Sequence, residues 1–386
     1  MKHALLMMGL ILGLAVNCQA EPGVVSLADF GAVMDGATDD AAAFKRAFDS
    51  GAKVVEVPAG AVAASEIVAP AGVTLRGVSE AGTVLVPTEN ASSRWITLHD
   101  DTVLERLTLD GRKAEAVAVW TGHVSNVKIR HVTIHDFQGM AIQTDHTTDM
   151  LIEDCTIENV QRATDLQFSR HVRVVNNVIR DCTEHGLQFW GNWQWQDKLS
   201  ADLQFIGNRV TRGGGGAIWG TGAKRVLIAN NIVDGAEDVG IDLEWCDDSV
   251  ITGNVVRRAR NGGIALFFAC HGVAITGNTV INDYPIPHDF DYSGFWVWSG
   301  IWLTYPNRET FPDDHGHRDI TIVGNVVLCA EGRRRAMWIG SESKNVTLGH
   351  NTIRGGGIWY GGAHRGAVAP MERISDNHVV NPTKED

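Results

Sequence analysis

The sequence has few of the features that mark membrane, nucleic-acid-binding or multidomain proteins. Its 386 residues include 33 Lys and Arg against 46 Asp and Glu, so the net charge of −13 disfavours a nucleic-acid partner. After the first twenty residues no apolar run is long enough to cross a bilayer, and no Pro/Ser-rich or charged linker divides the chain. We therefore expect one domain with no membrane span; the oligomeric state stays open.

Residues 1–20 have the layout of a cleavable secretory signal. Lys2 is followed by an apolar run over residues 4–16, and the segment ends at Ala20 before an acidic residue. Cleavage near Ala20 predicts that residues 21–386 are secreted as a single domain, either to the periplasm or to the outside of the cell.

Cysteine is scarce, and its number excludes a complete disulfide framework. Cys18 lies in the signal; as an alternative it is the lipidated residue of a lipoprotein, although Asn17 is a poor match to the small residue expected before it. Five cysteines remain, which cannot all pair. Cys246 and Cys270 lie one repeat apart and could form a bridge, but two buried thiols are the favoured interpretation. The other three are Cys155, Cys182 and Cys329.

A short pattern recurs along the chain: an apolar residue, two small or polar residues, Asn, then β-prone residues, as in residues 251–256 and 275–280. Most copies lie 22 to 26 residues apart, the length of one coil of a parallel β-helix. Asn tolerates the left-handed conformation of a sharp turn, and stacked amides hydrogen-bond one another. A leucine-rich solenoid is the alternative, but regularly spaced Leu is absent. The markers are Arg106, His131, Cys155, Asn177, Asn208, Asn231, Asn254, Asn278, Asn325, Asn351 and Asn377.

Two intervals exceed this period. Residues 192–198 must leave the coil as a loop, and residues 283–318 must form a loop or add one coil plus a loop. Long loops on a rigid scaffold often carry function, so both segments are candidate parts of a site.

The N-terminal segment carries a family resemblance in four short motifs: Asp29-Phe30-Gly31-Ala32, Asp35-Gly36, Thr38-Asp39-Asp40 and Val54-Val55-Glu56-Val57-Pro58-Ala59-Gly60. It resembles the start of the pectin-lyase-like superfamily. The resemblance implies an all-β, single-stranded right-handed parallel β-helix with a short N-terminal capping helix. That superfamily includes pectate lyases, polygalacturonases, other glycosidases, alginate epimerases and phage tailspikes, so the fold does not decide the reaction. The motifs of the individual subfamilies are missing.

Residues 21–60 are expected to form the cap segment. Thr38 or Asp39 is predicted to cap a helix from about Asp40 to Asp49. This helix would plug the open end of the β-helix and protect its edge.

One strand carries a pair of carboxylates that could act as catalytic groups. Strand residues alternate between inside and outside, so burial of Ile241 and Leu243 places Asp242 and Glu244 outside together, with Cα atoms roughly 7 Å apart. Such a pair can divide into a general acid and a base or nucleophile, as glycosidases require. The alternative is that both carboxylates are merely solvated.

Neighbouring coils place large or polar side chains at equivalent outer positions. Aromatic rings stack on the apolar faces of sugars, so this row predicts a glycan groove beside the carboxylate pair; alternatively, loops fold over the rings and bury them. The 283–318 segment adds acids, His and aromatics that could wall the groove. The expected substrate-binding residues are Trp190, Trp219, Trp302, Gln188, Phe267, His288 and Asp289.

The other polar residues are weaker candidates. Turn or strand-edge positions account for Asp145, His146, Asp165 and His185. Asp238 with Asp247 and Asp248 could suggest Ca²⁺, but a turn explains them equally well, so neither a metal nor another cofactor is expected.

Three functions remain in competition. The leading hypothesis is a secreted glycoside hydrolase in which Asp242 and Glu244 cleave a polysaccharide or oligosaccharide. The second is a polysaccharide lyase or uronate epimerase that uses Arg257, Arg260 or His288 to abstract a proton. The third is a non-catalytic glycan-binding β-helix.

Overall fold

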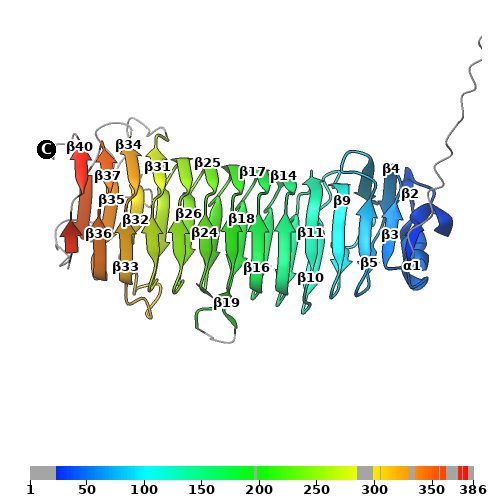
Figure 1. Ribbon diagram of the computed structural model, residues 1–386, viewed down its shortest axis with the longest axis horizontal. Helices are drawn as coiled ribbons and strands as arrows, with labels where there is room; N and C mark the ends of the chain where they lie inside the picture. The colour runs from blue at the N-terminus through cyan, green and yellow to red at the C-terminus, as the bar shows by residue number, and fades with distance from the viewer. Residues whose placement is uncertain are drawn as a thin grey trace, which may run out of the picture.

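The computed structural model describes residues 23–194, 198–284, 299–304, 306–329, 335–355, 357–361, 373–375 and 377–380. The chain winds into a right-handed parallel β-helix of about 13 turns, as the sequence predicts (Figure 1). The predicted signal lies outside the described residues, so secretion stays a prediction. In the part of the chain that the structure describes, no helix has the length and apolar character needed to cross a membrane.

Each coil contributes one strand to a separate 12-stranded sheet, which we call the 12-stranded wall. Its strands pair in parallel with their neighbours along its whole length. They are β5 (Ile67–Ala69), β8 (Arg94–Leu98), β10 (Val117–Gly122), β12 (Ile142–Asp145), β15 (Thr164–Gln167), β18 (Leu187–Trp190), β22 (Ile218–Thr221), β26 (Val239–Glu244), β29 (Gly262–Phe267), β32 (Ser299–Leu303), β35 (Arg335–Gly340) and β38 (Gly357–Gly361).

A 28-stranded sheet forms the other two walls, because β9 (Val103–Asp110) and β11 (Lys128–His135) run through both. The second wall contains β1 (Val24–Ser26), β3 (Val54–Val57), β6 (Thr74–Gly77), β13 (Thr148–Glu153), β16 (Arg170–Val175), β19 (Ser200–Ala201), β20 (Gln204–Ile206), β23 (Ala223–Lys224), β24 (Leu227–Ala229), β27 (Val250–Thr252), β30 (Ala274–Thr276), β33 (Arg318–Val323), β36 (Lys344–Gly349) and β39 (Arg373–Ser375). The third contains β2 (Asp35–Asp39), β4 (Gly60–Ala64), β7 (Thr83–Pro87), β14 (Thr156–Val160), β17 (Val178–Cys182), β21 (Arg209–Gly213), β25 (Ile232–Ala236), β28 (Val255–Ala259), β31 (Thr279–Asn282), β34 (Val326–Cys329), β37 (Thr352–Arg354) and β40 (His378–Val380).

The core is a set of aliphatic columns along the axis of the solenoid. Alternation along each strand sends every second side chain inward, and parallel pairing stacks equivalent side chains in successive coils. On the 12-stranded wall one column contains Leu187, Ile218, Ile241, Ile264 and Ile301, all of them fully buried. Each such side chain contributes about 1.5–3 kcal/mol of burial free energy.

A ladder of asparagines, seven of them buried and the last partly buried, joins eight coils at the turn between the second and third walls. In it, each side-chain amide donates to the amide oxygen of the next asparagine. Asn254, for example, donates from Nδ2 to Asn278 Oδ1 at 2.9 Å and to the Ile228 carbonyl oxygen at 2.9 Å. The members are Asn177, Asn208, Asn231, Asn254, Asn278, Asn325, Asn351 and Asn377.

The structure separates the two roles that the sequence analysis gave to the marker asparagines. The left-handed turn residue precedes the ladder residue: Asn230 has φ 56° and Gly253 has φ 66°. In the early coils Arg106 and His131, with φ 59° and 51°, occupy this turn position. Cys155 instead occupies the ladder position of its coil, because its backbone N–H donates to the side-chain oxygen of Asn177, the first ladder residue. Relative to Cys155, the positions of Arg106 and His131 are therefore shifted by one residue towards the N-terminus of the coil.

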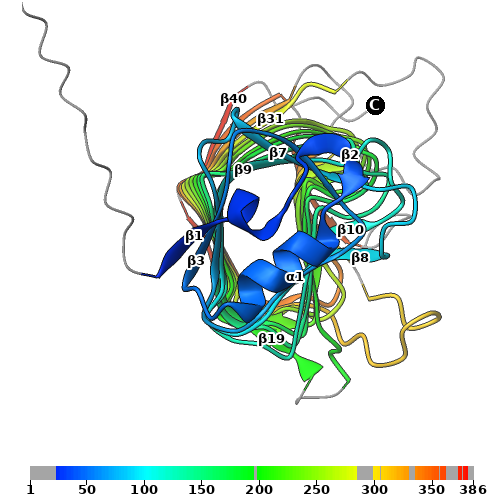
Figure 2. The same ribbon diagram turned by 90° about the vertical axis from the view of Figure 1, so that its right-hand side faces the viewer.

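The helix α1 (Ala41–Asp49) lies across the end of the solenoid, as expected (Figure 2). Phe44 and Phe48 are buried beneath it. The predicted Thr38 cap is wrong, because the Thr38 hydroxyl bonds to Asp35. Asp40 occupies the N-cap position, but its carboxylate accepts the N–H groups of residues 33 and 34, while Asp39 Oδ1 accepts the N–H of Ala41 at 3.0 Å.

Neither long interval adds a coil, and residues 299–303 of the second interval form β32 of the 12-stranded wall. Asn278 bonds directly to Asn325 across the second interval, and β31 pairs with β34, so the alternative of an inserted coil is wrong.

The five described cysteines are buried and form no disulfide, which agrees with the favoured interpretation. The backbone N–H of Cys246 lies 3.5 Å from Cys270 Sγ.

The asparagine ladder predicts a large effect of Asn254→Ala on stability. The substitution removes the side-chain donor to the Ile228 carbonyl oxygen and one of the two acceptors of the Asn231 side-chain amide in the interior, and the free energy of unfolding should fall by about 2–4 kcal/mol. Urea unfolding followed by circular dichroism measures this change. Asn90→Ala, on an exposed turn, should alter stability little. Equal effects of the two substitutions would contradict a structural role for the ladder.

Candidate active site

Parallel pairing places the outward side chains of the 12-stranded wall in rows, one residue per coil and about 4.8 Å apart. The row through Asp242 contains Gln143, Asp165, Gln188, Trp219, Asp242, Ala265 and Trp302. The row through Glu244 contains Asp145, Gln167, Trp190, Thr221, Glu244 and Phe267. These two rows hold most of the residues that the sequence analysis selected.

Asp242 and Glu244 project from the outer face of β26, as predicted, but they are not solvated. Asp242 is only 2% exposed, and its Oδ1 has no hydrogen-bond partner among the described residues. Glu244 is partly buried, and its Oε1 accepts the indole N–H of Trp219 at 3.2 Å. The interpretation of both carboxylates as ordinary surface groups is therefore wrong.

Burial makes this pair favour the protonated state. Loss of hydration raises the pKa of Asp242 well above its usual range, and the nearby charges of Glu244 and Asp238 raise it further. Desolvation also raises the pKa of Glu244 to about 7, although the Trp219 hydrogen bond opposes this change. Burial therefore favours the protonated form of Asp242, and a pKa of about 7 lets Glu244 give up its proton near neutral pH.

Trp219 connects this pair to the side chains of the preceding coil. One face of its ring stacks on His185, with ring centroids 4.9 Å apart and planes 10° apart, and Trp190 packs beside it at 5.8 Å. His185 Nδ1 accepts the backbone N–H of Gly216 at 2.9 Å, so the neutral ring carries its proton on Nε2. Burial, followed by the charge of Arg162, lowers the pKa of His185.

A pocket of about 350 Å³ lies on the side of Trp219 that faces the preceding coils, away from Asp242. Its lining includes Trp190, Trp219, His185 and Arg162, together with Asp165 and Gln188. Asp165 is 1% exposed and lies on the floor. Three coils separate it from Asp242, a distance of roughly 14 Å along the row.

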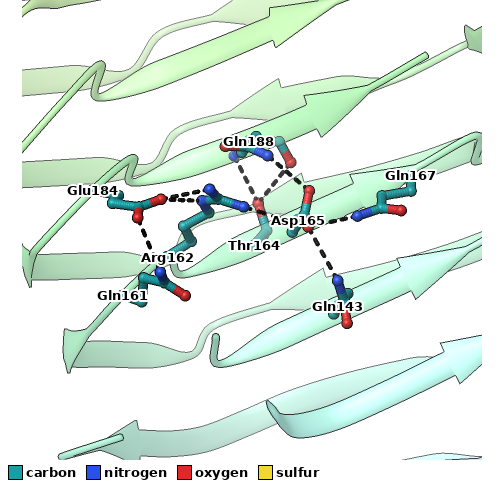
Figure 3. A network of polar contacts seen from close by, with 8 residues as sticks. All are labelled: Gln143, Gln161, Arg162, Thr164, Asp165, Gln167, Glu184 and Gln188. Atoms are coloured by element: carbon teal, nitrogen blue, oxygen red, sulfur yellow. Dashed lines mark hydrogen bonds and ion pairs between the residues drawn. The ribbon is translucent and has the colours of Figure 1, made fainter. Parts of the chain in front are cut away.

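Asp165 is the centre of a polar network (Figure 3). Its Oδ1 accepts Gln188 Nε2 at 2.8 Å, and its Oδ2 accepts Nε2 of Gln143 at 3.2 Å and of Gln167 at 2.8 Å. Arg162 Nη1 lies 3.7 Å from the same oxygen. The guanidinium also pairs with Glu184, whose Oε2 accepts Arg162 Nε at 2.7 Å. Asp165 is thus the buried centre of a polar network within β15 and does not lie at the turn or strand edge that the sequence suggested.

The predicted substrate-binding residues divide by exposure. Trp190 is 39% exposed, and Trp219 and Phe267 are partly buried. Gln188 is 4% exposed because it bonds to Asp165, and Trp302 is 5% exposed because it packs on Trp338 and Phe267. Neither is an exposed sugar platform. His288 and Asp289 lie outside the described residues.

Sequence reasoning missed Arg162, Glu184 and the coupling of Trp219 to Glu244. It also missed an aromatic cluster beside the wall, in which Trp193 stacks on Trp245 at 5.1 Å and Phe311 contacts Phe268 at 4.4 Å. Aligning the sequences of the coils in register would have shown that Arg162 and Asp165 lie on the same coil. The aromatic cluster had no such signal, since Trp193 and Phe311 come from loops.

The residues considered for Ca²⁺ have other partners. Asp238 accepts Asn261 Nδ2 at 2.9 Å, and Asp247 pairs with Lys224 and His271. Among the described residues, two other groups bring three potential ligand atoms within 4.8 Å of one another: His123, Asp145 and His146, and Asp110, His135 and Asp136. Within each group a His already bonds to a carboxylate, as in the 2.7 Å contact between His146 and Asp145. The expectation of no metal stays a prediction.

The raised pKa values predict that Asp242→Asn stabilises the protein at alkaline pH. A carboxyl with a raised folded-state pKa stabilises the fold fully below its ordinary pKa, and this contribution is lost as pH rises towards the raised pKa. At pH 8 the variant should be more stable than wild type by about 1–3 kcal/mol, and at pH 5 the difference should be smaller. Urea unfolding at both pH values measures the difference.

Asp181→Asn is the matched control for this prediction. The Arg212 hydrogen bonds lower the pKa of Asp181, so the sign is opposite and no gain is expected at pH 8. A stability difference between Asp242→Asn and wild type that is the same at pH 5 and pH 8 would contradict the account.

Comparison with known proteins assigns the fold family. The family model described as "Right handed beta helix region" matches residues 72–192 and 197–300, more than half of the chain. No curated protein sequence matches. Among solved structures, the A-module of a mannuronan C-5 epimerase from Azotobacter vinelandii aligns with TM-score 0.70 and 16% identity, covering 92% of this chain and 99% of that chain.

Two further structures show how widely the fold is shared. The catalytic unit of a GH87 α-1,3-glucanase from Streptomyces thermodiastaticus aligns with TM-score 0.67 and 15% identity, covering 95% of this chain and 71% of that chain. A surface adhesin of Streptococcus pneumoniae aligns with TM-score 0.64 and 15% identity, covering 93% and 90%. These identities establish similarity of fold alone. With the family match, they show that the chain belongs to the right-handed β-helix family.

Proposed function

We propose that the chain is a glycoside hydrolase that acts on a polysaccharide or oligosaccharide. Asp242 is the general acid, and Glu244 is the base or nucleophile. The observation that carries the proposal is the position of Asp242, a buried carboxyl with an unbonded oxygen and a raised pKa, two residues from a carboxyl whose pKa lies near 7. Pairs of carboxyls whose environments set different protonation states are the pattern of acid/base catalysis.

The proposed reaction uses this difference in protonation. Asp242 donates its proton to the glycosidic oxygen as the bond from that oxygen to the sugar carbon breaks. Glu244, ionised, either attacks that carbon or removes a proton from the attacking water. Because Asp242 is 2% exposed, the side chains that cover it must move when substrate binds. Trp190 and Trp219 would support sugar rings on the adjacent coils.

The structural neighbours support a carbohydrate ligand without defining the reaction. One neighbour is named as an epimerase of mannuronan and another as an α-1,3-glucanase, and both share this solenoid. The adhesin shares it as well, so a non-catalytic binding protein is the alternative.

The described residues offer less support for a lyase or epimerase. Arg257 pairs with Asp283, and Arg260 pairs with Glu237. Arg257 belongs to β28 of the third wall and Arg260 follows it, so neither shares the outer face of the 12-stranded wall with Asp242. His288, the other candidate base, lies outside the described residues.

A screen of reaction products tests the proposal. The mature protein should release new reducing ends from at least one member of a panel of plant, algal and bacterial polysaccharides, without the ultraviolet absorbance of an unsaturated end. Asp242→Asn and Glu244→Gln should each lower kcat by about 10²–10⁴-fold, the usual contribution of a general acid or base.

The control substitution is Asp181→Asn, which removes a carboxylate from the third wall and should leave kcat unchanged. Ultraviolet-absorbing products, or hydrolysis that survives both active-site substitutions, would contradict the proposal. Binding without products would favour the non-catalytic alternative.

A further inference from the structure

The pocket beside Trp219 has a feature that the proposed reaction does not use: its floor is organised around one buried carboxylate. A carboxylate accepts hydrogen bonds and cannot donate them, so the three glutamines that surround Asp165 must turn their NH₂ groups toward it. In each amide the oxygen points away from the nitrogen. Asp165 therefore orients the amide oxygens of the three glutamines away from itself (Figure 3). Two of these glutamines, Gln167 and Gln188, line the pocket and provide its hydrogen-bond acceptors.

The net charge of this network also disfavours an anionic ligand. The one guanidinium, Arg162, contacts two carboxylates, Asp165 and Glu184, which gives a formal net charge of −1. The Arg162 contacts are directed to those two partners, at 2.7 Å for Nε to Glu184 and 3.7 Å for Nη1 to Asp165. His185 is neutral and adds only its Nε2–H donor. No other cationic side chain lines the pocket within the described part of the chain.

From this arrangement we infer that the pocket is a sugar subsite that selects neutral or amino sugars and rejects uronates. Hydroxyl and ammonium groups can donate to the amide oxygens, whereas a uronate carboxylate would meet acceptors and negative charge. The partly exposed Trp190 and Trp219 supply ring faces, and the volume of about 350 Å³ suits a single pyranose. The inference rests on the carbohydrate ligand of the proposed function but not on hydrolysis.

Matched oligosaccharide pairs test this selectivity. Each pair has the same linkage and differs only at C6: β-1,4-mannose and β-1,4-mannuronate hexamers, β-1,4-glucose and β-1,4-glucuronate hexamers, and α-1,4-galactose and α-1,4-galacturonate hexamers. A β-1,4-glucosamine hexamer is added as the amino sugar. Titration calorimetry gives Kd for each. A neutral or amino hexamer should bind at least about tenfold more tightly than every uronate, the effect of one charge-assisted contact.

Substitution of Asp165 connects the selectivity to this pocket. Asp165→Asn removes the negative charge and the fixed orientation of the amides, so Kd for the preferred hexamer should rise about tenfold and its advantage over the matched uronate should shrink. A purely structural role would weaken both members of a pair equally. Asp181→Asn removes one carboxylate from another wall and should change neither Kd.

If Asp165→Asn does not fold by circular dichroism, Gln167→Leu replaces it, because it removes one acceptor from a partly exposed position. Equal or tighter binding of a uronate, or an unchanged ratio in the folded variant, overturns the inference. Absence of binding by all seven hexamers also overturns it. Selective binding without reducing-end products supports this subsite and contradicts only the hydrolase assignment.

Discussion

Parallel hydrogen bonding between successive coils in a constant register is the constraint on which the rest of the structure depends. It stacks equivalent residues about 4.8 Å apart, so each outward position becomes a row along the solenoid. The asparagine ladder reinforces this register over eight coils, because each amide except the last donates a hydrogen bond to the amide of the next coil. Residues 77 positions apart in sequence, such as Asp165 and Asp242, thereby share one face.

The same register creates the chemistry of the candidate site. The coil of Trp219 lies between the coil of Gln188 and the coil of Asp242, so its indole can stack on His185 and donate a hydrogen bond to Glu244. A carboxyl as buried as Asp242 opposes folding when it is ionised, and a rigid solenoid can tolerate that energy. The site therefore lowers stability locally, and the many repeated hydrogen bonds of the scaffold compensate for this loss.

The sequence predicted the fold well because its signal is periodic. Asn254 and Asn278 mark the coil length, and the alternation around Ile241 and Leu243 correctly gave the outward direction of Asp242 and Glu244. Burial was less predictable, since it depends on what packs above a row: Gln188 and Trp302 are covered by neighbours from other coils. The network around Asp165 was also missed, because most of its hydrogen bonds join residues about one coil apart.

The proposed reaction requires Asp242 to keep its proton at neutral pH. Carbon-13 NMR of protein labelled at the aspartate carboxyls, titrated from about pH 4 to 9 with Asp242→Asn to assign the resonance, tests it directly. The Asp242 resonance should keep the shift of a protonated carboxyl well above the pH at which an ordinary aspartate titrates. A resonance that has titrated completely by about pH 5 would contradict the account.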